Sequence, residues 1–307
     1  MLNYKPNLMF LKDIFKFHMS FISLAVLMSC MIVEEEDMRK YKIKSGDNLY
    51  DLNAPDKKYI LPKRLEEISG LAYWKKNILL CVEDETGYLY LFDHDKEEII
   101  NEIKFGKKGD YEGVAQSNDI AYVIRSDGRL YYFEIKDEPE VTKVNLPFTK
   151  KNDLEGITLG HQNDTFYITC KRSSDLFGKD LKGRTVYKYD SKEDTVIQNP
   201  YIHLTTKMFE KEVENAGLSP SRHMPFMPSG IAIHPLTEDV FLLSSVGKLL
   251  VVFNKSGELV SMAPLKRAIF RQPEGICFDE KGNLFISSEG RGGNGYILKF
   301  NNQPSDQ

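Results

Sequence analysis

Short apolar runs separated by polar turns recur along the chain from about residue 58 onward. Five of these runs open with Ser-Gly or Glu-Gly followed by an aliphatic residue, and their glycines are Gly70, Gly113, Gly156, Gly230 and Gly275. Successive glycines lie 43, 43, 74 and 45 residues apart. A repeat near this length is typical of propeller blades built from four short strands. The pattern therefore predicts an all-β, five-bladed β-propeller.

The last repeat is incomplete, because the chain runs into a polar tail after three apolar runs. An apolar run over residues 58–61 precedes the first repeat and is predicted to supply the missing outer strand. Closing the ring in this way removes the free edges that an open sheet would expose. The predicted propeller covers residues 58–302 and leaves 303–307 as a C-terminal tail. A sixth blade, placed in the 74-residue step, is the alternative.

Two insertions interrupt the repeats, over residues 173–183 and 200–227. The second contains an amphipathic pattern over 203–218 that predicts a helix of about three turns. Its apolar face is made by Leu204, Met208, Phe209, Val213 and Ala216. In an up-and-down blade both insertions emerge at the same end as the Ser-Gly and Glu-Gly starts. Loops on a rigid scaffold commonly carry binding residues, so this face is predicted to be the functional one.

The N-terminal region has the pattern of a targeting segment. Lys5, Lys12 and Lys16 precede an uncharged, apolar run over 17–33. This arrangement predicts a signal peptide over 1–29. An uncleaved membrane-spanning anchor is the alternative, because the run is about as long as the shortest segments that span a bilayer.

The end of this segment resembles the bacterial lipobox, on the residues Leu27-Met28-Ser29-Cys30. That resemblance implies cleavage before Cys30 and acylation of its thiol, with palmitate as an acyl group. Residues 30–57, which are charged and lack periodicity, are then a lipidated tether. Their acidic cluster at 34–37 resembles the export signal of Bacteroidetes-type surface lipoproteins. We therefore expect a lipid anchor in the outer membrane of a bacterial cell envelope, compatible with surface exposure, and Met9 is an alternative start.

Composition and charge narrow the range of partners. The chain has 41% hydrophobic and 28% charged residues, and its 41 basic and 45 acidic residues give a formal net charge of −4. Without a basic patch, nucleic acid is not an expected partner, and we expect a monomer. The histidines lack metal-binding spacing, so no zinc site is expected. Apart from Cys30, the cysteines lie in apolar runs and are predicted to be buried free thiols: Cys81, Cys170 and Cys277.

Three of the five inner-strand starts carry glutamate, namely Glu112, Glu155 and Glu274, and Asp110 and Asp153 stand two residues before the first two. The innermost strand of a blade borders the channel, so these carboxylates are predicted to cluster there. Clustered carboxylates repel one another unless a cation neutralises them. Ca²⁺ suits such a cluster because it accepts six to eight oxygen ligands. These residues are therefore the candidate metal or ligand site, with Ca²⁺ as the candidate cofactor.

Three other interpretations of the carboxylates remain open. In the first, the carboxylates join neighbouring blades by hydrogen bonds, and glycine is required where backbones crowd near the axis. In the second, they form ion pairs with basic residues of the same rim. In the third, two of the carboxylates act as the acid and the base of a catalytic site. No nucleophile elbow, HExxH helix or phosphate-binding loop occurs in the sequence, so catalytic residues stay unassigned. The rim residues predicted at this face are Glu83, Asp84, Arg125, Lys171, Arg172, Ser288 and Glu289.

Ordered motifs over about residues 58–300 resemble those of the SdiA-regulated family of bacterial propellers. They read EISGLAY, VEDETGYLYLFD, GDYEGVA, NDLEGIT, PSGIAIHPLTEDVFLLSS and PEGICFDEKGNLFISSEG. The resemblance implies a propeller in a cell-envelope protein without a settled activity and, by similarity, calcium binding at Glu112, Glu155 and Glu274. Ser69 and Ser229 stand at the other two starts, which excludes a symmetric ring of five carboxylates.

The sequence as a whole predicts a lipid-anchored propeller that binds a ligand or an envelope partner through the face of the Glu-Gly starts, with or without Ca²⁺. Two alternatives remain. One is a calcium-dependent hydrolase of the lactonase or phosphodiester type at the same face. The other is a structural interaction scaffold.

Overall fold

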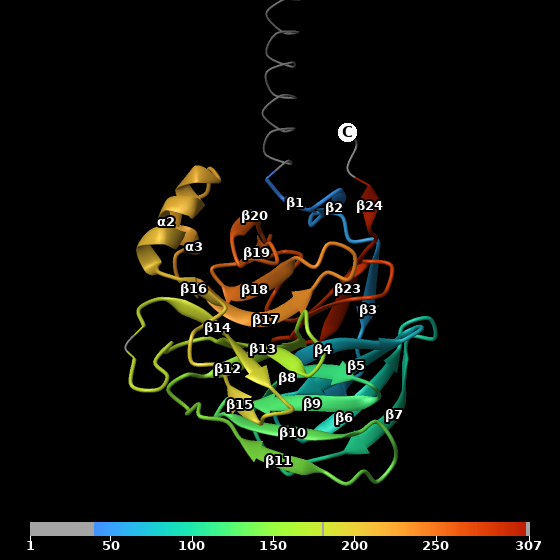
Figure 1. Cartoon of the computed structure of the whole chain (residues 1–307). Coiled ribbons are helices and arrows are strands. Elements are labelled where there is room, and N and C mark those ends of the chain that lie inside the picture. Colours follow the sequence, from blue (N-terminus) through green and yellow to red (C-terminus); the bar gives the residue numbers. More distant parts are fainter. Residues whose placement is uncertain (1–39, 180, 305–307) are drawn as a thin grey trace, which may run out of the picture. The chain divides into compact units, whose positions relative to one another are not determined.

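Five antiparallel sheets form a ring around a central channel (Figure 1). The computed structural model describes residues 40–304 except residue 180, and the propeller unit begins at Lys42. Each blade has four strands in ladder order, and blade 3 has a short additional strand. The predicted five-bladed β-propeller is confirmed, and the six-bladed alternative is wrong.

The strands of blades 1 to 4 follow one another in sequence from the channel outward. Blade 1 is β4 (Ile68–Lys75), β5 (Ile78–Glu83), β6 (Tyr88–Asp93) and β7 (Glu98–Lys104). Blade 2 is β8 (Tyr111–Ser117), β9 (Ile120–Arg125), β10 (Arg129–Glu134) and β11 (Thr142–Asn145). Blade 3 is β12 (Leu154–Leu159), β13 (Thr165–Cys170), β14 (Arg184–Asp190), β15 (Thr195–Val196) and β16 (Ile202–Leu204). Blade 4 is β17 (Met227–Ile233), β18 (Val240–Val246), β19 (Leu249–Phe253) and β20 (Leu259–Pro264).

Blade 5 joins the two ends of the propeller. Its three inner strands are β21 (Pro273–Phe278), β22 (Leu284–Ser288) and β23 (Tyr296–Phe300), and its outer strand is β3 (Lys57–Ile60). β3 pairs antiparallel with β23, and Ile60 lies opposite Tyr296. A short 3-10 helix, η1 (Lys63–Leu65), then leads into blade 1. The N-terminal donor of the missing outer strand is therefore confirmed.

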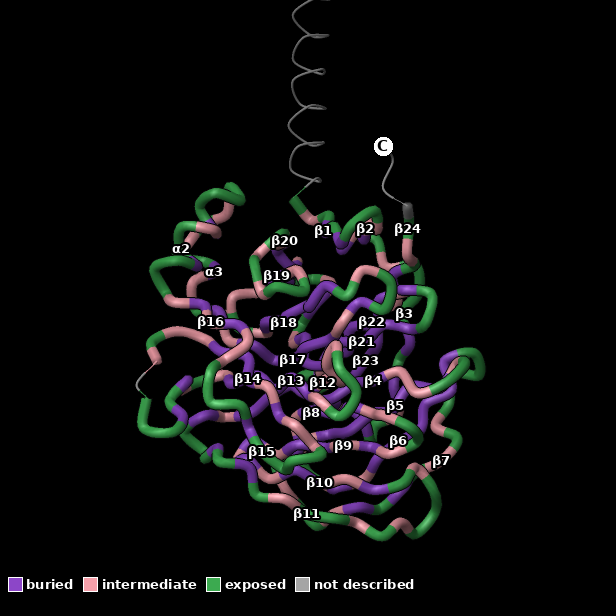
Figure 2. The backbone as a smooth tube through the Cα atoms, in the orientation of Figure 1, coloured by how far each residue is buried: buried purple, intermediate pink, exposed green. Residues whose placement is uncertain are grey.

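The hydrophobic core lies between neighbouring blades. Phe105 of blade 1 stacks on Phe133 of blade 2, with 5.1 Å between the ring centroids. Tyr111 and Tyr131 pack edge-on against Phe105 in the same layer. Inner strands are buried along most of their length, whereas outer strands such as β7 alternate between covered and exposed residues (Figure 2). Packing between blades thus uses the strand aromatics.

An N-terminal hairpin packs against blades 4 and 5. It consists of β1 (Lys42–Ser45) and β2 (Asn48–Asp51), and β24 (Gln303–Pro304) adds a third strand. Ile43 and Tyr50 are buried in one cluster with Phe241 and Phe278. The Tyr50 hydroxyl donates a hydrogen bond to Gly282 O at 2.6 Å. The hairpin is therefore part of the propeller core.

This hairpin corrects the expected tether over 30–57, because residues 42–51 are folded. The run KIKS alternates exposed lysines with the buried Ile43 and Ser45, and in NLYD the side chain of Tyr50 is buried. Ile43 and Tyr50 pack against blades 4 and 5. The charged residues of this segment indicated a tether, but its buried apolar side chains make it part of the fold. The expected C-terminal tail over 303–307 likewise begins with a strand, β24.

The predicted helix is present but shorter than 203–218. α2 (Thr206–Asn215) begins after Thr205, whose side chain accepts a hydrogen bond from Met208 N. Phe209 and Val213 are buried as predicted, but Met208 is 59% exposed. Leu204 belongs to β16, because pairing with β14 takes it into the sheet. A second, one-turn helix, α3 (Pro220–His223), follows.

Among the described residues, no helix is both long and apolar enough to cross a bilayer. The predicted signal peptide and Cys30 lie outside the described residues, so lipidation stays a prediction. Cys81, Cys170 and Cys277 are free and buried.

Candidate functional site

Every inner strand has a β-bulge at its Ser-Gly or Glu-Gly pair. On β8, Tyr111 pairs with Arg125 and Gly113 pairs with Ile124, so Glu112 has no partner in the ladder. The same kind of register shift occurs in β4, β12, β17 and β21. A bulge bends the strand and re-aims the side chain of the extra residue. Together the bulges bring five residues around one small space in the channel: Ser69, Glu112, Glu155, Ser229 and Glu274.

The glycine of each pair lies against the inner strand of the next blade. A Cβ atom on Gly113 would lie 3.0 Å from Ile157 N, and one on Gly275 would lie 2.8 Å from Leu71 N. The second contact closes the ring from blade 5 to blade 1. Glycine is therefore required by the close approach of neighbouring backbones, in agreement with crowding near the axis.

The serines at the other two strand starts form hydrogen bonds from one blade to the next. Ser69 Oγ donates to Tyr111 O at 2.7 Å, and Ser229 Oγ donates to Pro273 O at 2.9 Å. Both serines are buried. Hydrogen bonding between blades was one of the open interpretations of the strand starts, and the serine positions have it.

The three glutamates share one positively charged neighbour. Glu155 is 2% exposed, and its Oε1 atom lies 2.6 Å from Lys171 Nζ. Lys171 follows β13 in the same blade and also interacts electrostatically with Glu274 and Glu112. One ammonium group therefore interacts with all three carboxylates, of which Glu155 and Glu274 are buried and Glu112 is half-buried, and Lys248 also interacts electrostatically with Glu274.

Burial raises the pKa of each of these carboxyl groups. The pKa of Glu155 rises to about 7, although Lys171 opposes the effect. The pKa of Glu274 rises to about 8, and repulsion from Glu155 adds to the effect of burial. Burial and the charge of Glu155 also hold the pKa of Glu112 well above its usual value. Protonation of some of these groups near neutral pH reduces their mutual repulsion.

In this arrangement the residues do not fit a calcium site. Across residues 40–304 apart from 180, no group of three or more His, Cys, Asp or Glu side chains is placed to hold a metal ion. Asp110 accepts a hydrogen bond from Ser126, and Asp153 pairs with Arg172 at 3.0 Å. Together with Lys171, these contacts favour the ion-pair interpretation of the cluster. We therefore expect no calcium binding at these carboxylates while Lys171 pairs with Glu155.

Two of the predicted rim residues have local partners. Glu83 accepts hydrogen bonds from the backbone N–H groups of Glu85 at 3.0 Å and Thr86 at 2.8 Å. Arg125 pairs with Asp127. Both side chains therefore stabilise their own turns.

Three further rim residues, Asp84, Ser288 and Glu289, belong to blades 1 and 5, and Asp84 lies close enough to Glu289 to interact electrostatically. Burial, together with the nearby charges of Glu67 and Glu289, raises the pKa of Asp84 to about 7. Burial also raises the pKa of Glu289. Ser288 is fully buried.

An apolar ring separates the carboxylates from the opposite end of the channel. It is formed by the residue after each glycine: Leu71, Val114, Ile157, Ile231 and Ile276. On the carboxylate side the enclosed space is only about 10 Å³, which is roughly the room of one water molecule. The ring therefore closes the channel to larger molecules.

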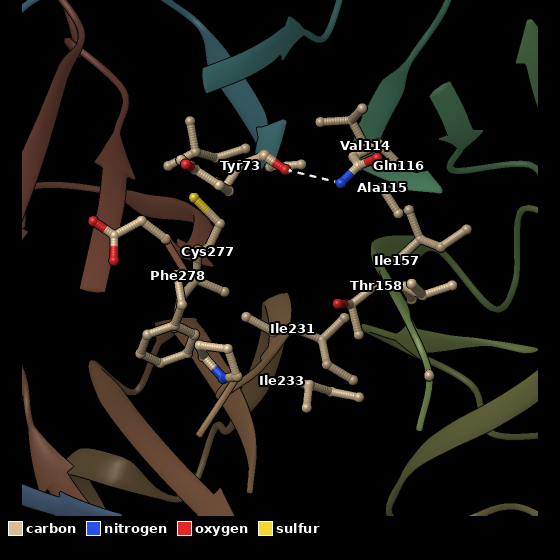
Figure 3. Close-up of a pocket in the computed structure, with 18 of the residues that line it drawn as sticks. Tyr73, Val114, Ala115, Gln116, Ile157, Thr158, Ile231, Ile233, Cys277 and Phe278 are labelled. Carbon is tan, nitrogen blue, oxygen red and sulfur yellow. Dashed lines mark hydrogen bonds between the residues drawn. The ribbon is translucent and has the colours of Figure 1, made fainter. Parts of the chain in front are cut away.

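The opposite end of the channel opens into a cavity of about 330 Å³, hereafter the channel cavity. All five inner strands contribute to its wall (Figure 3). On the side of the apolar ring that faces away from the carboxylates, the cavity is lined by apolar side chains such as Ile233 and Phe278. Its polar side chains are Tyr73, Gln116, Thr158, Asp279 and Glu280. The volume lies at the lower end of the range for small-molecule pockets, which is roughly 300–1,000 Å³.

The polar groups of the channel cavity suit binding rather than catalysis. Gln116 Nε2 donates to Tyr73 O at 3.3 Å (Figure 3), and the Tyr73 hydroxyl is hydrogen-bonded to Glu280. Burial, followed by that hydrogen bond, raises the pKa of Tyr73, so its hydroxyl stays protonated. Burial likewise raises the pKa of Cys277, and a protonated thiol is a poor nucleophile.

The sequence prediction places the functional face at the carboxylate end and does not find the channel cavity. A signal for it was present in the second half of each inner strand. Residues 72–73 and 115–116 read Ala-Tyr and Ala-Gln, and Thr158 follows the aliphatic residue of the third repeat. Small and polar side chains at these positions leave space on the axis that larger aliphatic residues would fill.

The comparisons with known proteins agree with the fold. The profile of the SdiA-regulated family matches residues 56–291. A glutaminyl cyclase from Myxococcus xanthus has a similar structure, with a TM-score of 0.56 and 11% identity over 82% of this chain and 97% of that one. A luciferin-regenerating enzyme has a TM-score of 0.49 and 12% identity, over 80% of this chain and 95% of that one. At 11% identity the likeness to the glutaminyl cyclase shows the fold alone. The search of curated proteins gives no match.

Proposed function

We propose that this chain, which belongs to the SdiA-regulated family, is a lipid-anchored binding protein of the bacterial cell envelope whose ligand enters the channel cavity. The observation that carries the proposal is the cavity of about 330 Å³, walled by the inner strands of all five blades. Such a pocket is pre-formed, so a ligand need not order it. The space of about 10 Å³ at the carboxylate end is too small for an organic ligand.

The walls of the channel cavity favour a ligand with an apolar body and one polar group. Aliphatic and aromatic side chains make the floor and sides, and burying apolar ligand surface against them yields roughly 25 cal/mol per Å². Thr158, Gln116 and the hydrogen-bonded Tyr73 and Glu280 offer polar contacts. A polar head group would bind to these residues while its apolar part faces the ring.

The N-terminal hairpin supports a ligand that comes from a membrane. Ser45 Oγ donates to Asp239 Oδ2 at 2.8 Å, and Tyr50 donates to Gly282 O. Asp239 and Gly282 lie in turns at the cavity end of blades 4 and 5. Cys30 precedes Lys42 by 12 residues, and a segment of this length reaches about 40 Å when extended. An acyl group on Cys30 would keep the cavity end near the bilayer. Asp279 and Glu280 in the cavity wall disfavour a carboxylate head group, so an uncharged amphiphile such as a monoacylglycerol is the ligand class that fits best.

The hydrolase alternative has less support from the geometry. A calcium-dependent reaction at Glu112, Glu155 and Glu274 needs a cation on carboxylates that already share Lys171. The scaffold alternative gains support from the hydrogen bonds of Ser69 and Ser229 between blades, and it becomes the preferred reading if no ligand binds.

Titration calorimetry of the purified protein with the uncharged monodecanoylglycerol tests the proposal. Thr158→Phe should fill the channel cavity and weaken binding at least tenfold. Thr142→Phe, an exposed substitution on β11 outside the cavity, is the matched control and should bind like the wild type. Absence of binding to the wild type would contradict a monoacylglycerol ligand. Binding that is unchanged in Thr158→Phe would place the site elsewhere.

A further inference from the structure

A second pocket lies outside the channel, at the joint between blades 3 and 4. Its volume is about 230 Å³, and we name it the tyrosine–lysine pocket. Its lining residues come from both blades: His161, Gln162, Thr165, Tyr167, Lys188, Tyr201 and Lys255. The two pockets share no residue among those that the structure describes. The tyrosine–lysine pocket is therefore a site separate from the channel cavity.

A pair of tyrosines forms a rigid wall of this pocket. The rings of Tyr167 and Tyr201 stack with 4.4 Å between centroids and 28° between planes. The Tyr167 hydroxyl lies 2.7 Å from His161 Nδ1, and His161 Nε2 lies 2.7 Å from Glu238 O. A carbonyl oxygen only accepts, so Nε2 carries a proton, and in the neutral ring Nδ1 accepts from Tyr167. The Tyr201 hydroxyl donates to Lys255 O at 2.8 Å. Both hydroxyl groups are thereby fixed across the blade joint.

Lys188 brings a positive charge to this wall. Its Nζ atom lies 4.6 Å from the ring centroid of Tyr201 and 5.7 Å from that of Tyr167. Within the described part of the chain, no carboxylate forms an ion pair with Lys188, whereas Lys255 pairs with Glu238 at 2.7 Å. Two lysines and one glutamate leave the pocket with one net positive charge. The charge is held over aromatic faces, which attract a cation without neutralising it.

The pocket distinguishes Lys188 from other lysines that lie over tyrosines. Lys143 lies 5.6 Å from the Tyr131 ring on blade 2, and Lys104 lies 3.9 Å from the Tyr88 ring. Neither of these lysines lines the channel cavity, the small space at the carboxylates or the tyrosine–lysine pocket. Lys143 packs over its ring, and Lys104 also donates a hydrogen bond from Nζ to Thr86 O at 2.7 Å. For Lys188, packing over the two rings leaves the charged ammonium group at the edge of the tyrosine–lysine pocket.

We propose that the tyrosine–lysine pocket binds a small organic carboxylate. A carboxylate carries one negative charge, which matches the net charge of the pocket. A phosphate monoester carries about −1.5 to −2 at neutral pH and would leave an excess of negative charge beside Glu238. Gln162 and Thr165 line the same pocket and can donate hydrogen bonds to the rest of the ligand. The volume of about 230 Å³ limits the ligand to less than the size of a typical drug molecule.

Ligand-observed NMR of the full chain tests this proposal with three matched probes. Glucuronate is the carboxylate, glucose is its uncharged counterpart, and glucose 6-phosphate is the more highly charged one. Glucuronate should give saturable binding, glucose none at the same concentration, and glucose 6-phosphate weaker binding. Lys188→Met should weaken glucuronate binding at least tenfold, and Lys188→Arg should stay within about threefold of the wild type.

Lys143→Met is the control, because it removes a lysine over a tyrosine outside the pocket, and it should bind like the wild type. Thermal melting of each variant checks that it is folded. Equal binding of glucose, tighter binding of glucose 6-phosphate, or unchanged binding in Lys188→Met would each overturn the proposal. Thr158→Phe should leave glucuronate binding unchanged, so failure here and failure of the channel-cavity proposal are separate results.

Discussion

Lys171 Nζ lies 2.6 Å from Glu155 Oε1, and the same ammonium group interacts electrostatically with Glu274 and Glu112 in the channel. Lys171 is 28% exposed and Glu155 is 2% exposed, so water reaches only one side of the pair. The contact joins the end of β13 to the start of β12 and balances part of the charge of Glu112 and Glu274.

Replacing Lys171 by methionine should destabilise the protein by roughly 3 kcal/mol, because it leaves buried carboxylates without their cation. The double variant Lys171→Met/Glu155→Gln should recover part of that loss. Arg172→Met, which breaks the more exposed pair with Asp153, should cost at most about 1 kcal/mol. Urea unfolding at pH 7 measures all three. If Lys171→Met and Arg172→Met lowered the free energy of unfolding equally, Lys171 would not be the main cation of the channel carboxylates.

Calcium should not change the thermal stability of the protein. The observation behind this prediction is that Lys171 already pairs with Glu155 while Asp110 and Asp153 have other partners. Melting curves with added calcium and with EDTA should therefore coincide. A rise in melting temperature with calcium that disappears in Glu112→Gln would restore the metal interpretation of this site.

The raised pKa of Glu274 predicts a loss of stability at high pH. Its pKa is about 8 in the folded protein and 4.5 when solvated, so folding favours the protonated form. The stabilising contribution of that form is complete below about pH 4.5 and is lost as the pH rises through about 8. Glu274→Gln mimics the protonated form. Between pH 5 and pH 9 the free energy of unfolding should fall by less in this variant than in the wild type, with a difference of at least about 1 kcal/mol. Urea unfolding across this range, with the exposed Glu98→Gln as control, measures the difference. Parallel pH profiles of the wild type and Glu274→Gln would argue against it.

The N-terminal hairpin should contribute to global stability. Ile43 is fully buried between blades, and Ile43→Ala should cost about 2–5 kcal/mol. Ile60→Ala is the matched control, because Ile60 lies on β3 but is 53% exposed, and its cost should stay within about 0.5 kcal/mol. Chemical unfolding followed by circular dichroism compares the two. If residues 42–51 were a tether, the two variants would be equally stable.

Acylation of Cys30 predicts that the protein incorporates labelled palmitate in a bacterial host and sediments with membranes. Cys30→Ala should lose the label, and the signal peptidase inhibitor globomycin should cause the unprocessed precursor to accumulate. Cys81→Ala removes a buried thiol instead and should keep the label. Label retained by Cys30→Ala would count against the lipid anchor.

Much of the architecture follows from local signals in the sequence. The five Gly-aliphatic starts and their spacing determined the number of blades, because each blade is a local unit of four strands joined by turns. The run at 58–61 indicated the closing strand, because the last repeat visibly lacked one. The strand starts at Ser69, Glu112 and their equivalents also marked the channel, since an inner strand must begin beside the axis.

Other features depended on contacts between residues far apart in the chain, and only the tertiary structure decided them. The bulges determine where the five starts point, and Lys171 became the partner of Glu155 because β13 returns beside β12. Ile43 and Tyr50 are folded because they meet blades 4 and 5 nearly 200 residues later. The two pockets arise where side chains from several blades leave space unfilled. Local patterns specify strands and their order, whereas cavities and ion pairs depend on how the blades pack against one another.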